Sequence, residues 1–591
     1  MIILLGILGA TVLALVLDMV RLDIVALLCL LALAWTGLLT PQQALSGFSS
    51  NAVMAMVAVM IMSEGAARTG MMERVARWVA GMAQHDKRGL VGLSSLTVGV
   101  LSGLVQNVGA AALFLPALLD ISRRERIAAT ELIMPVGFAA ILGGTLTMIG
   151  SGPLIVSGDL LREAGLVPYG FLDVTPIGLA LLLGGIAYFY LFGNRVLPRG
   201  ATEGGPSPQK RLIDAWRLPF VLHHYVISDE SRLHGKTPED AGLWEEYRLN
   251  VLALSHDGDL SYAPWRGTTF AAGQDLVLLG VEEDMRRFAE AYQLEAREKL
   301  GEFRHLEDPA RAGFAEVIIP PRSEIVGKSI REYALRKRWS VEPLIYFGDG
   351  VEVRGDFSDR RIEPGDLFVV HGLWQHIMAM RESADFVVVT SVEAEPRETS
   401  KAWLAALCFA GAVALALAGF AISLAFLSGA VAMVLLGVLD MDRAYQAIEW
   451  KVVFLVGGLI PLGIAMEGTG TAAFLGETVM AVLHGHHPAV VMLGIAVMAT
   501  LFSLFMSNVA STIVLAPVVI NMAEFGGLDP RPMVLLTAVC AANAFVLPTH
   551  QVNALLMTPG GYEVRDYVRA GTGMTVLFLL IVIAGFYLLY V

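Results

Sequence analysis

The sequence has few charged residues for its length. Asp, Glu, Lys and Arg make up 16% of the 591 residues, against about 25% in ordinary soluble domains. Much of this charge falls in the central third, and the two outer thirds are nearly free of it. A chain that is 55% hydrophobic and charged mainly in its middle is predicted to lie largely within a membrane.

Other absences exclude several classes of function. The three cysteines, Cys29, Cys408 and Cys540, lie in apolar segments at spacings that fit neither a disulfide framework nor a metal site. The sequence contains no basic tract interleaved with aromatic residues, so nucleic-acid binding is not expected. It also contains no nucleophile–base pair or metal-ligand spacing that would indicate an enzyme. No tightly bound cofactor is expected.

The apolar segments fall into two similar halves. A helix that spans a bilayer needs about 20 mostly apolar residues, and each outer third offers five such candidates. In each half, a further apolar segment with polar residues in it lies between the third and fourth candidates. The candidates are residues 2–17, 22–38, 49–64, 131–156 and 174–193 in the first half, and 402–418, 421–439, 452–466, 530–557 and 571–591 in the second.

The two polar segments resemble each other. The first, LSGLVQNVGAAALFLP, covers residues 101–116, and the second, FSLFMSNVASTIVLAP, covers 502–517. Asn107 corresponds to Asn508 at an offset of 401 residues (508 − 107). Paired, interrupted apolar segments in two halves of a chain are typical of a transporter's binding site. Each segment is predicted to form a re-entrant hairpin, the alternative being a pair of ordinary short helices.

The charges around the hairpins indicate that the two halves have opposite orientations. Basic residues flank the first hairpin, whereas acidic residues and histidines flank most of the second. By the positive-inside rule, the first hairpin enters from the cytoplasm and the second from outside. Arg195 and Lys210 keep the middle third cytoplasmic. The sequence therefore predicts a multi-pass membrane protein with both termini external.

The middle third is predicted to be a cytoplasmic α+β insert made of two similar lobes. The sequence Gly235-Lys-Thr of the first copy is matched by Gly327-Lys-Ser of the second, 92 residues later (327 − 235). Alternating apolar runs that end in Asp-Gly pairs predict β-hairpins in both copies. The predicted domains are a first membrane repeat (1–200), a first lobe (205–300), a second lobe (308–395) and a second membrane repeat (398–591).

The paired hairpins with Asn107 and Asn508, each followed by a broken helix, resemble the divalent anion/sodium symporters. The stretch PTHQVNALLMTPGGYEVRDYVRAG, residues 548–571, is similar to the sulfate-permease branch of that family. The duplicated middle resembles the C-terminal lobe of potassium-conductance regulators, called RCK-C or TrkA-C. The resemblance implies a polytopic α-helical membrane protein of two inverted repeats, each with five spans and a re-entrant hairpin. It also implies a homodimer in a bacterial inner (plasma) membrane and an elevator mechanism, in which the hairpin tips and broken helices hold an anion and sodium.

The hairpin tips depart from the family's Ser-Asn-Thr pattern, because a valine replaces the threonine in both. The missing hydroxyls argue against a dicarboxylate and leave room for a smaller oxyanion, with the hydroxyls of Ser511, Thr512, Thr145 or Thr147 as substitutes. Neither the tips nor the breaks at 143–152 and 543–553 contain Lys or Arg, so helix N-termini are expected to bind the anion and unwound backbone carbonyls the sodium ion. Asn107 and Asn508 are candidate ligands for both. The candidate substrate- and ion-binding residues are Gln106, Asn107, Val108, Gly143, Gly144, Thr145, Thr147, Ser507, Asn508, Val509, Ser511, Thr512, Asn543, Thr549, His550 and Asn553.

These features predict a secondary active, sodium-coupled importer of sulfate or a similar small oxyanion. The central lobes are expected to bind a small cytosolic ligand and regulate transport, or to act only as a dimer clamp. One alternative is a proton-coupled carrier of dicarboxylates or sulfonates, in which His550 carries the proton. A potassium-transport component is another, suggested by the lobes alone, and the inverted halves argue against it.

Overall fold

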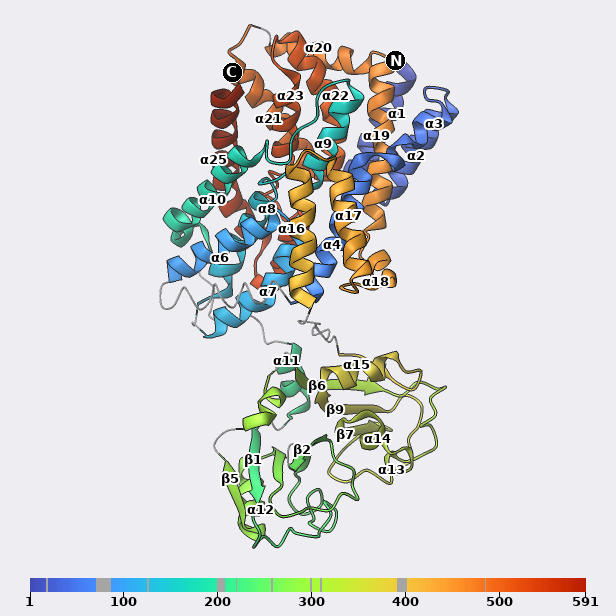
Figure 1. Ribbon diagram of the computed structural model, residues 1–591, viewed down its shortest axis with the longest axis vertical. Helices are drawn as coiled ribbons and strands as arrows, with labels where there is room; N and C mark the ends of the chain where they lie inside the picture. Colours follow the sequence, from blue (N-terminus) through green and yellow to red (C-terminus); the bar gives the residue numbers. More distant parts are fainter. Residues whose placement is uncertain are drawn as a thin grey trace. The chain divides into compact units, whose positions relative to one another are not determined.

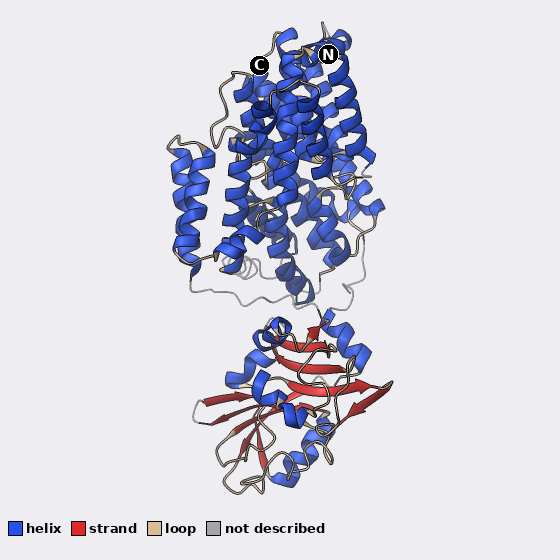
Figure 2. Cartoon of the chain, turned by 90° about the vertical axis from the view of Figure 1, so that its right-hand side faces the viewer, coloured by secondary structure: helices blue, strands red, loops and turns tan. Residues whose placement is uncertain are grey.

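The chain folds into two compact units in a computed structural model. The helical unit comprises Met1–Gly205 and Arg397–Val591, and the insert comprises Pro206–Pro396. The described strands all belong to the insert (Figure 2). The predicted domain boundaries at 200, 205, 395 and 398 lie outside the described residues. The structure describes residues 1–17, 20–70, 87–124, 127–198, 208–218, 221–256, 259–297, 300–308, 311–390, 401–483 and 485–590.

Long apolar helices build the helical unit. Among the described residues, six helices are long and apolar enough to cross a membrane, and nine shorter apolar helices of 10–17 residues accompany them. The first half contains α1 (Ile2–Leu17), α2 (Leu22–Trp35), α3 (Pro41–Leu45), η1 (Ser46–Ser49), α4 (Asn51–Arg68), α6 (Lys87–Ser102), α7 (Asn107–Arg124), α8 (Ala129–Gly143), α9 (Gly152–Glu163) and α10 (Thr175–Val196). The second contains α16 (Ala402–Leu417), α17 (Ile422–Leu435), α18 (Met441–Gln446), α19 (Trp450–Gly468), α20 (Thr471–Leu483), α21 (Pro488–Phe505), α22 (Asn508–Phe525), α23 (Pro530–Cys540), α24 (Gln551–Gly560) and α25 (Val564–Tyr590).

The structure refines the predicted spans in two places. The candidates 131–156 and 530–557 are each broken, by the loops 144–151 and 541–550, into the pairs α8–α9 and α23–α24. The separate helix α20 was not predicted. It exists because Gly470 adopts a left-handed backbone (φ +69°) that ends α19 and lets the chain turn.

The two halves pack reciprocally. Helix α2 of the first half packs against α19 of the second, and α17 of the second packs against α4 of the first. In the same way α9 packs against α22, and α24 packs against α7. In Figure 1, the α6–α7 pair lies in the lower half of the helical unit and the α21–α22 pair in its upper half. Such exchange is the packing expected of two repeats related by a pseudo-two-fold axis.

The insert consists of two lobes with the same topology. Its two five-stranded sheets have the orders β3-β2-β4-β1-β5 and β10-β6-β9-β7-β8, which coincide when β6 to β10 are aligned with β1 to β5. A bulge between Val251 and Ala253 in β2 recurs between Pro343 and Ile345 in β7. The strands are β1 (Val221–Ile227), β2 (Asn250–His256), β3 (Asp259–Tyr262), β4 (Asp275–Gly280), β5 (Leu294–Arg297), β6 (Ala312–Ile318), β7 (Glu342–Gly348), β8 (Val351–Arg354), β9 (Leu367–Leu373) and β10 (Val387–Val388). The helices are α11 (Pro208–Trp216), α12 (Glu282–Tyr292), η2 (Gly301–Leu306), α13 (Ile330–Tyr333), α14 (Leu335–Trp339) and α15 (Trp374–Glu382).

The two lobes share a hydrophobic core within one chain. Buried residues of β2 and β4, such as Leu252 and Val277, belong to the same cluster as Leu344 and Val369 of β7 and β9.

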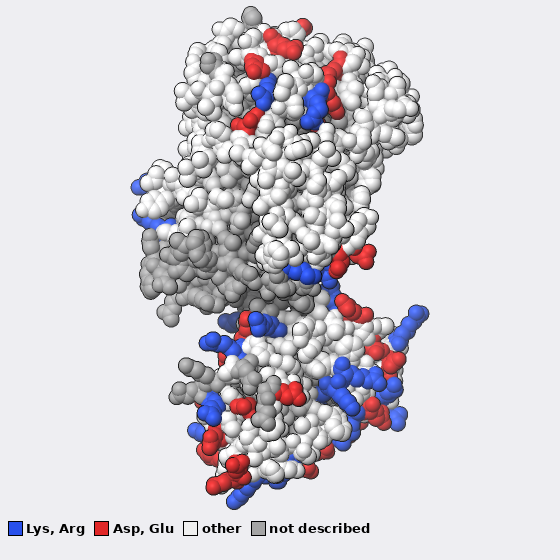
Figure 3. Space-filling model, viewed as in Figure 1, with Lys and Arg blue, Asp and Glu red and all other residues white. Residues whose placement is uncertain are grey.

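The surfaces of the two units differ in charge. On the face shown in Figure 3, charged side chains of both signs cover the insert, whereas the described middle of the helical unit is almost free of them.

Candidate functional site

The first hairpin tip is fixed by contacts around Asn107. Its side chain is 8% exposed, and its Oδ1 lies 2.9 Å from the hydroxyl of Ser102 at the end of α6. The Ser102 hydroxyl also lies 2.6 Å from the carbonyl oxygen of Ala140 in α8. A Cβ on Gly144 would lie 2.2 Å from Asn107 Oδ1, so only glycine lets the backbone approach the amide this closely. The Asn107 amide therefore lies directly against the start of the first unwound loop.

The unwound loop 144–151 contacts both hairpin tips. At its first end it meets Asn107 through Gly144, and the Thr147 hydroxyl donates a hydrogen bond to the carbonyl of Gly103 in the first tip. Directly after the loop, at the first residue of α9, a Cβ on Gly152 would lie 2.6 Å from a methyl carbon of Val509 in the second tip. The structure thus brings residues from two segments about 400 positions apart to one eight-residue loop.

The second tip leaves more side-chain groups without partners. The Ser507 hydroxyl caps α22 by accepting a hydrogen bond from the Ala510 amide at 3.2 Å. The fully buried hydroxyl of Ser511 has no hydrogen-bond partner in the described part of the chain, and the Asn508 side chain beside it is half-buried. The Ser151 hydroxyl, next to the Gly152–Val509 contact, is also buried without a partner there. Unpaired buried polar groups are costly, so these groups are available to a ligand.

The four hydroxyls that could replace the threonine hydroxyls missing from the tips differ in whether they have hydrogen-bond partners. Thr145 donates to the carbonyl of Leu142 at 2.6 Å, and Thr512 donates to that of Asn508 at 3.0 Å. Thr147 donates to Gly103. These three threonine hydroxyls therefore already donate to backbone carbonyls. Of the four, Ser511 is the one whose hydroxyl has no partner among the described residues.

The second broken helix holds its polar residues in a different network. Asn543 is fully buried; its Nδ2 donates to Thr500 Oγ1 at 3.2 Å, and its Oδ1 accepts from Thr575 Oγ1 at 3.1 Å. Asn553 Nδ2 donates to the carbonyl of Ala544 at 3.0 Å across the loop. His550 Nδ1 accepts from the Val552 amide and so caps α24. These contacts fix the break, so Asn543 and Asn553 act first as structural supports. Of the remaining candidates, Thr549 is exposed, and Gln106 and Val108 are half-buried.

Helix ends supply the electrostatics of the site. The helices α7, α9, α22 and α24 begin at the tips or after the breaks, and α8 and α23 end at the breaks. Helix N-termini carry partial positive charge and free N–H groups, which bind anions. C-terminal carbonyls carry partial negative charge and bind cations such as sodium. No Lys or Arg occurs at positions 101–116, 143–152, 502–517 or 543–553. The arrangement therefore suits a small anion and a cation bound together, because neither finds a full opposite charge from the protein.

Several residues around the site were not identified from the sequence. Ser102 was recognised only as part of the repeat. Thr500 and Thr575 lie in apolar helices and gave no signal, because such threonines usually bond to their own helix. Asp159 of α9 is 6% exposed and its Oδ2 accepts the Ala52 amide at 2.5 Å, which ties α9 to the start of α4. A carboxylate in an apolar segment was the one available sign of such a contact.

The sequence of the chain is similar to those of known transporters. Residues 12–540 match the model of a family described as citrate transporter, CitMHS. The chain belongs to this family. Over 590 residues it is 30% identical to "Uncharacterized transporter YfbS" of Escherichia coli (strain K12), with 94% of each chain covered. Over 577 residues it is 26% identical to "Uncharacterized transporter sll0640" of Synechocystis, covering 96% of this chain and 93% of that one. A shorter match, 22% identical over 355 residues, joins it to "Sodium/sulfate cotransporter 1" of Chlamydomonas reinhardtii, covering 56% of this chain and 39% of that protein.

Membership of the citrate transporter family confirms the predicted integral membrane transporter. It also agrees with the absence of enzymatic motifs from the sequence, since the family consists of transporters.

Proposed function

We propose that the chain is a sodium-coupled importer of sulfate or a similar small oxyanion, with the substrate bound where both hairpin tips meet the loop 144–151. The observation that carries this proposal is the double contact of that loop, with Asn107 at Gly144 and with Val509 at Gly152. A ligand placed there reaches the N-termini of α9 and α22 together, and the unpaired hydroxyls of Ser151 and Ser511 lie close to those termini in sequence.

The chemistry of the donors favours a compact oxyanion. Hydroxyl, amide and backbone N–H groups donate hydrogen bonds to several oxygens at once without adding charge. Sulfate carries two negative charges, and burying them without a cation is very costly. A sodium ion bound at the C-terminal carbonyls of α8, with oxygen ligands from the loop, would offset part of this charge. Sulfate would then bind well only together with sodium, and this dependence would couple sulfate transport to the sodium gradient. Three relatives named as sodium/sulfate cotransporters, 22–24% identical to this chain, support the same substrates.

A second substrate class is a citrate-like carboxylate, which the description of the matched family favours. Citrate is larger and would need hydroxyl donors from both tips. Valine at 108 and 509 removes two of these donors. In this second candidate, carboxylate transport is coupled to protons in place of sodium.

For the insert we propose a cytoplasmic regulatory role as two RCK-C-like lobes. The equal strand orders of the two sheets support a duplicated module. The lobes share a core within one chain, so their pairing does not itself require a second subunit. The homodimer, the bacterial plasma membrane and the orientation with external termini are proposed on the family resemblance and the charge asymmetry.

Uptake of labelled sulfate into proteoliposomes tests the proposal. Uptake should require an inward sodium gradient, and Asn107→Ala and Asn508→Ala should each lower it at least about tenfold, the effect of about one lost charge-assisted hydrogen bond. Asn521→Ala is the matched control, because Asn521 lies on α22 but bonds only to the Pro517 carbonyl of its own helix. Citrate uptake driven by a pH gradient, with no sulfate uptake under either gradient, would replace the proposal by the second candidate.

A further inference from the structure

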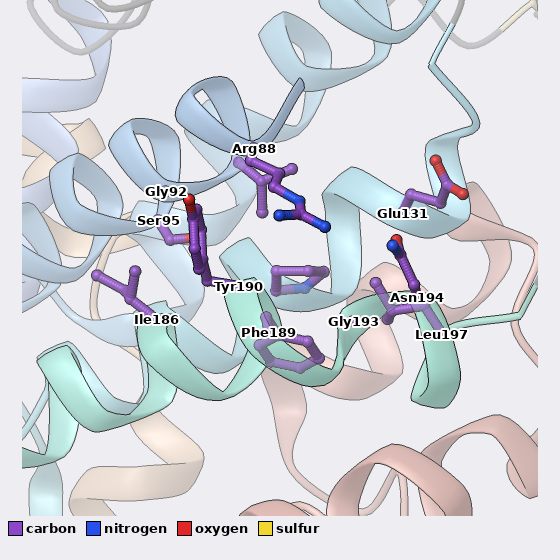
Figure 4. Close-up of a pocket in the computed structure, with 12 residues that line it drawn as sticks. Arg88, Gly92, Ser95, Glu131, Ile186, Phe189, Tyr190, Gly193, Asn194 and Leu197 are labelled. Atoms are coloured by element: carbon purple, nitrogen blue, oxygen red, sulfur yellow. The ribbon is translucent and has the colours of Figure 1, made fainter. Parts of the chain in front are cut away.

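A cavity lies between α6, α8 and α10, away from the hairpin tips (Figure 4). It encloses about 190 Å³. In Figure 4, Glu131 and Asn194 lie on one side of it and Ile186 and Ser95 on the other. Arg88 in the first turn of α6, Glu131 in the first turn of α8 and Asn194 near the end of α10 form the polar end. Each of these residues lies at a helix end, so the polar mouth lies where the three helices reach one surface of the helical unit.

The walls become apolar with depth. Ile186 and Phe189 of α10 and Pro135 of α8 line the interior. Gly92 leaves room on the α6 side, since a Cβ there would meet only a methyl carbon of Ile186 at 4.0 Å. Ser95 lies seven residues beyond Arg88, about 10 Å further along the helix axis. Its hydroxyl is 1% exposed and has no hydrogen-bond partner among the described residues. A buried hydroxyl that lines a cavity without a partner is a group for which a ligand is missing.

We propose that this cavity binds a membrane phospholipid whose headgroup carries both a phosphate and an ammonium, as in phosphatidylethanolamine. The outer face of α10 is apolar and exposed at Leu183 and Leu191, so the cavity adjoins the surface that a bilayer covers. Arg88 binds the phosphate; its guanidinium lies 5.4 Å from the centroid of the Tyr190 ring, which holds the cation at the mouth.

The remaining groups match the rest of such a lipid. Glu131 at the same mouth attracts the ammonium, which distinguishes this headgroup from phosphatidylglycerol. The Ser95 hydroxyl donates to an ester carbonyl of the glycerol, and an acyl chain follows Ile186 toward the bilayer. The cavity also lies one helical turn from Gly99, whose backbone contacts Gly143 at the closest crossing of α6 and α8. A lipid wedged between these helices therefore supports the spacing that holds Asn107 against Gly144.

Lipid retention by the purified full chain tests this site without relying on transport. The protein is incubated with deuterated phosphatidylethanolamine or phosphatidylglycerol in detergent, passed over a sizing column and analysed by native mass spectrometry. The wild type should retain about one phosphatidylethanolamine per chain in preference to phosphatidylglycerol. Arg88→Gln should lower this retention roughly tenfold, as expected for a lost charge-assisted hydrogen bond. Gly92→Leu, which fills the cavity, should lower it similarly.

Two further variants separate the parts of the proposal. Glu131→Gln should still retain lipid but lose the preference for phosphatidylethanolamine over phosphatidylglycerol. Arg195→Gln, an exposed cation on α10 that does not line the cavity, should behave as the wild type. Equal retention by the wild type, Arg88→Gln and Gly92→Leu would overturn the site. A wild type that prefers phosphatidylglycerol would overturn the assigned headgroup.

Discussion

At the scale of single residues, the candidate site depends on close backbone approaches more than on charges. Gly144 allows the loop to touch the amide of Asn107, and Gly143 allows α8 to touch Gly99 of α6, where a Cβ would lie 2.0 Å from a carbonyl oxygen. Both approaches position the first tip. A side chain at either glycine would displace the groups that are proposed to bind the ligand.

Gly144→Ala should therefore impair transport strongly. The new Cβ would lie 2.2 Å from Asn107 Oδ1 and 2.7 Å from its Nδ2, so the amide must move. Losing its contact should lower sodium-driven sulfate uptake at least about tenfold, the effect of one hydrogen bond to an anion. Gly158→Ala in α9 is the control, because its Cβ meets nothing within 4 Å. Wild-type uptake by Gly144→Ala in proteoliposomes would separate Asn107 from the binding site.

His371 should make the insert sensitive to acid. It is 4% exposed in β9, and burial lowers its pKa from 6.5 to about 4. Between these values the unfolded chain binds a proton that the folded insert excludes, so stability is complete above pH 6.5 and is lost as the pH falls toward 4. The loss should reach about 3 kcal/mol.

Urea unfolding of residues 206–396 at pH 7, 5.5 and 4 measures this loss. His371→Leu removes the titrating group and should flatten the profile over this range. His234→Gln, which changes an exposed histidine, should keep the wild-type slope. A profile unchanged by His371→Leu would mean that other groups cause the acid sensitivity.

The sequence identified part of the site because the chain is duplicated. Asn107 and Asn508 were found because they recur at corresponding places in two apolar segments. Thr500 and Thr575 did not stand out in that comparison, and their bonds to Asn543 depend on how α21, α25 and the second loop meet in space. Such contacts between segments distant in the chain are set by packing, which neither periodicity nor composition specifies.

At the scale of elements, helix ends were easier to predict than helix partners. The glycine-rich and proline-containing breaks were visible in the sequence, and the loops 144–151 and 541–550 confirm them. The reciprocal pairing of α9 with α22 and of α24 with α7 was not visible, although it is what brings two tips to one loop. In the insert the repeated Gly-Lys motifs were found, but the shared core of the two lobes was not.

An arginine joins the two lobes of the insert. Arg266 is 8% exposed; its Nη2 lies 2.6 Å from Glu239 Oε1 of its own lobe and 2.7 Å from Asp356 Oδ2 of the other. Burial tends to raise the pKa of Asp356, but the hydrogen bonds from Arg266 and Ser358 outweigh it and lower that pKa to about 2. Asp356 is therefore ionised throughout the physiological range. Arg266 is its charged partner, and the Ser358 amide donates a further hydrogen bond at 3.0 Å.

Arg266→Ala should destabilise residues 206–396 by about 3 kcal/mol, because it leaves the mostly buried carboxylate of Asp356 without its charged partner. Urea unfolding at pH 7 measures the change. Arg287→Ala is the control: Arg287 is 54% exposed and its pair with Asp284 lies on the surface, so its removal should cost less than about 1 kcal/mol. Equal effects of the two variants would mean that the lobes do not depend on this ion cluster.

At the scale of the whole molecule, the two units have separate hydrophobic cores. The largest cluster contains only residues from 4–197 and 404–586, and the three clusters of the insert contain only residues from 212–388. Since burial of apolar surface is the main favourable term in folding, each unit contains what it needs to fold by itself. The insert is then a module added between two repeats that pack on each other without it.

Deleting residues 206–396 and joining the ends with a flexible Gly/Ser linker should leave a folded transporter. The helical unit should enter the membrane, elute as a single species in detergent and retain sodium-driven sulfate uptake within about threefold, because α7, α9 and α22 keep their contacts. Aggregation of the deleted chain, with a stable isolated insert, would show that the repeats need the insert to assemble. A monomeric but active deletion would assign the insert to dimer formation. An active dimer that no longer responds to a cytosolic ligand of the full chain would assign it to regulation, because the site itself lies entirely within the helical unit.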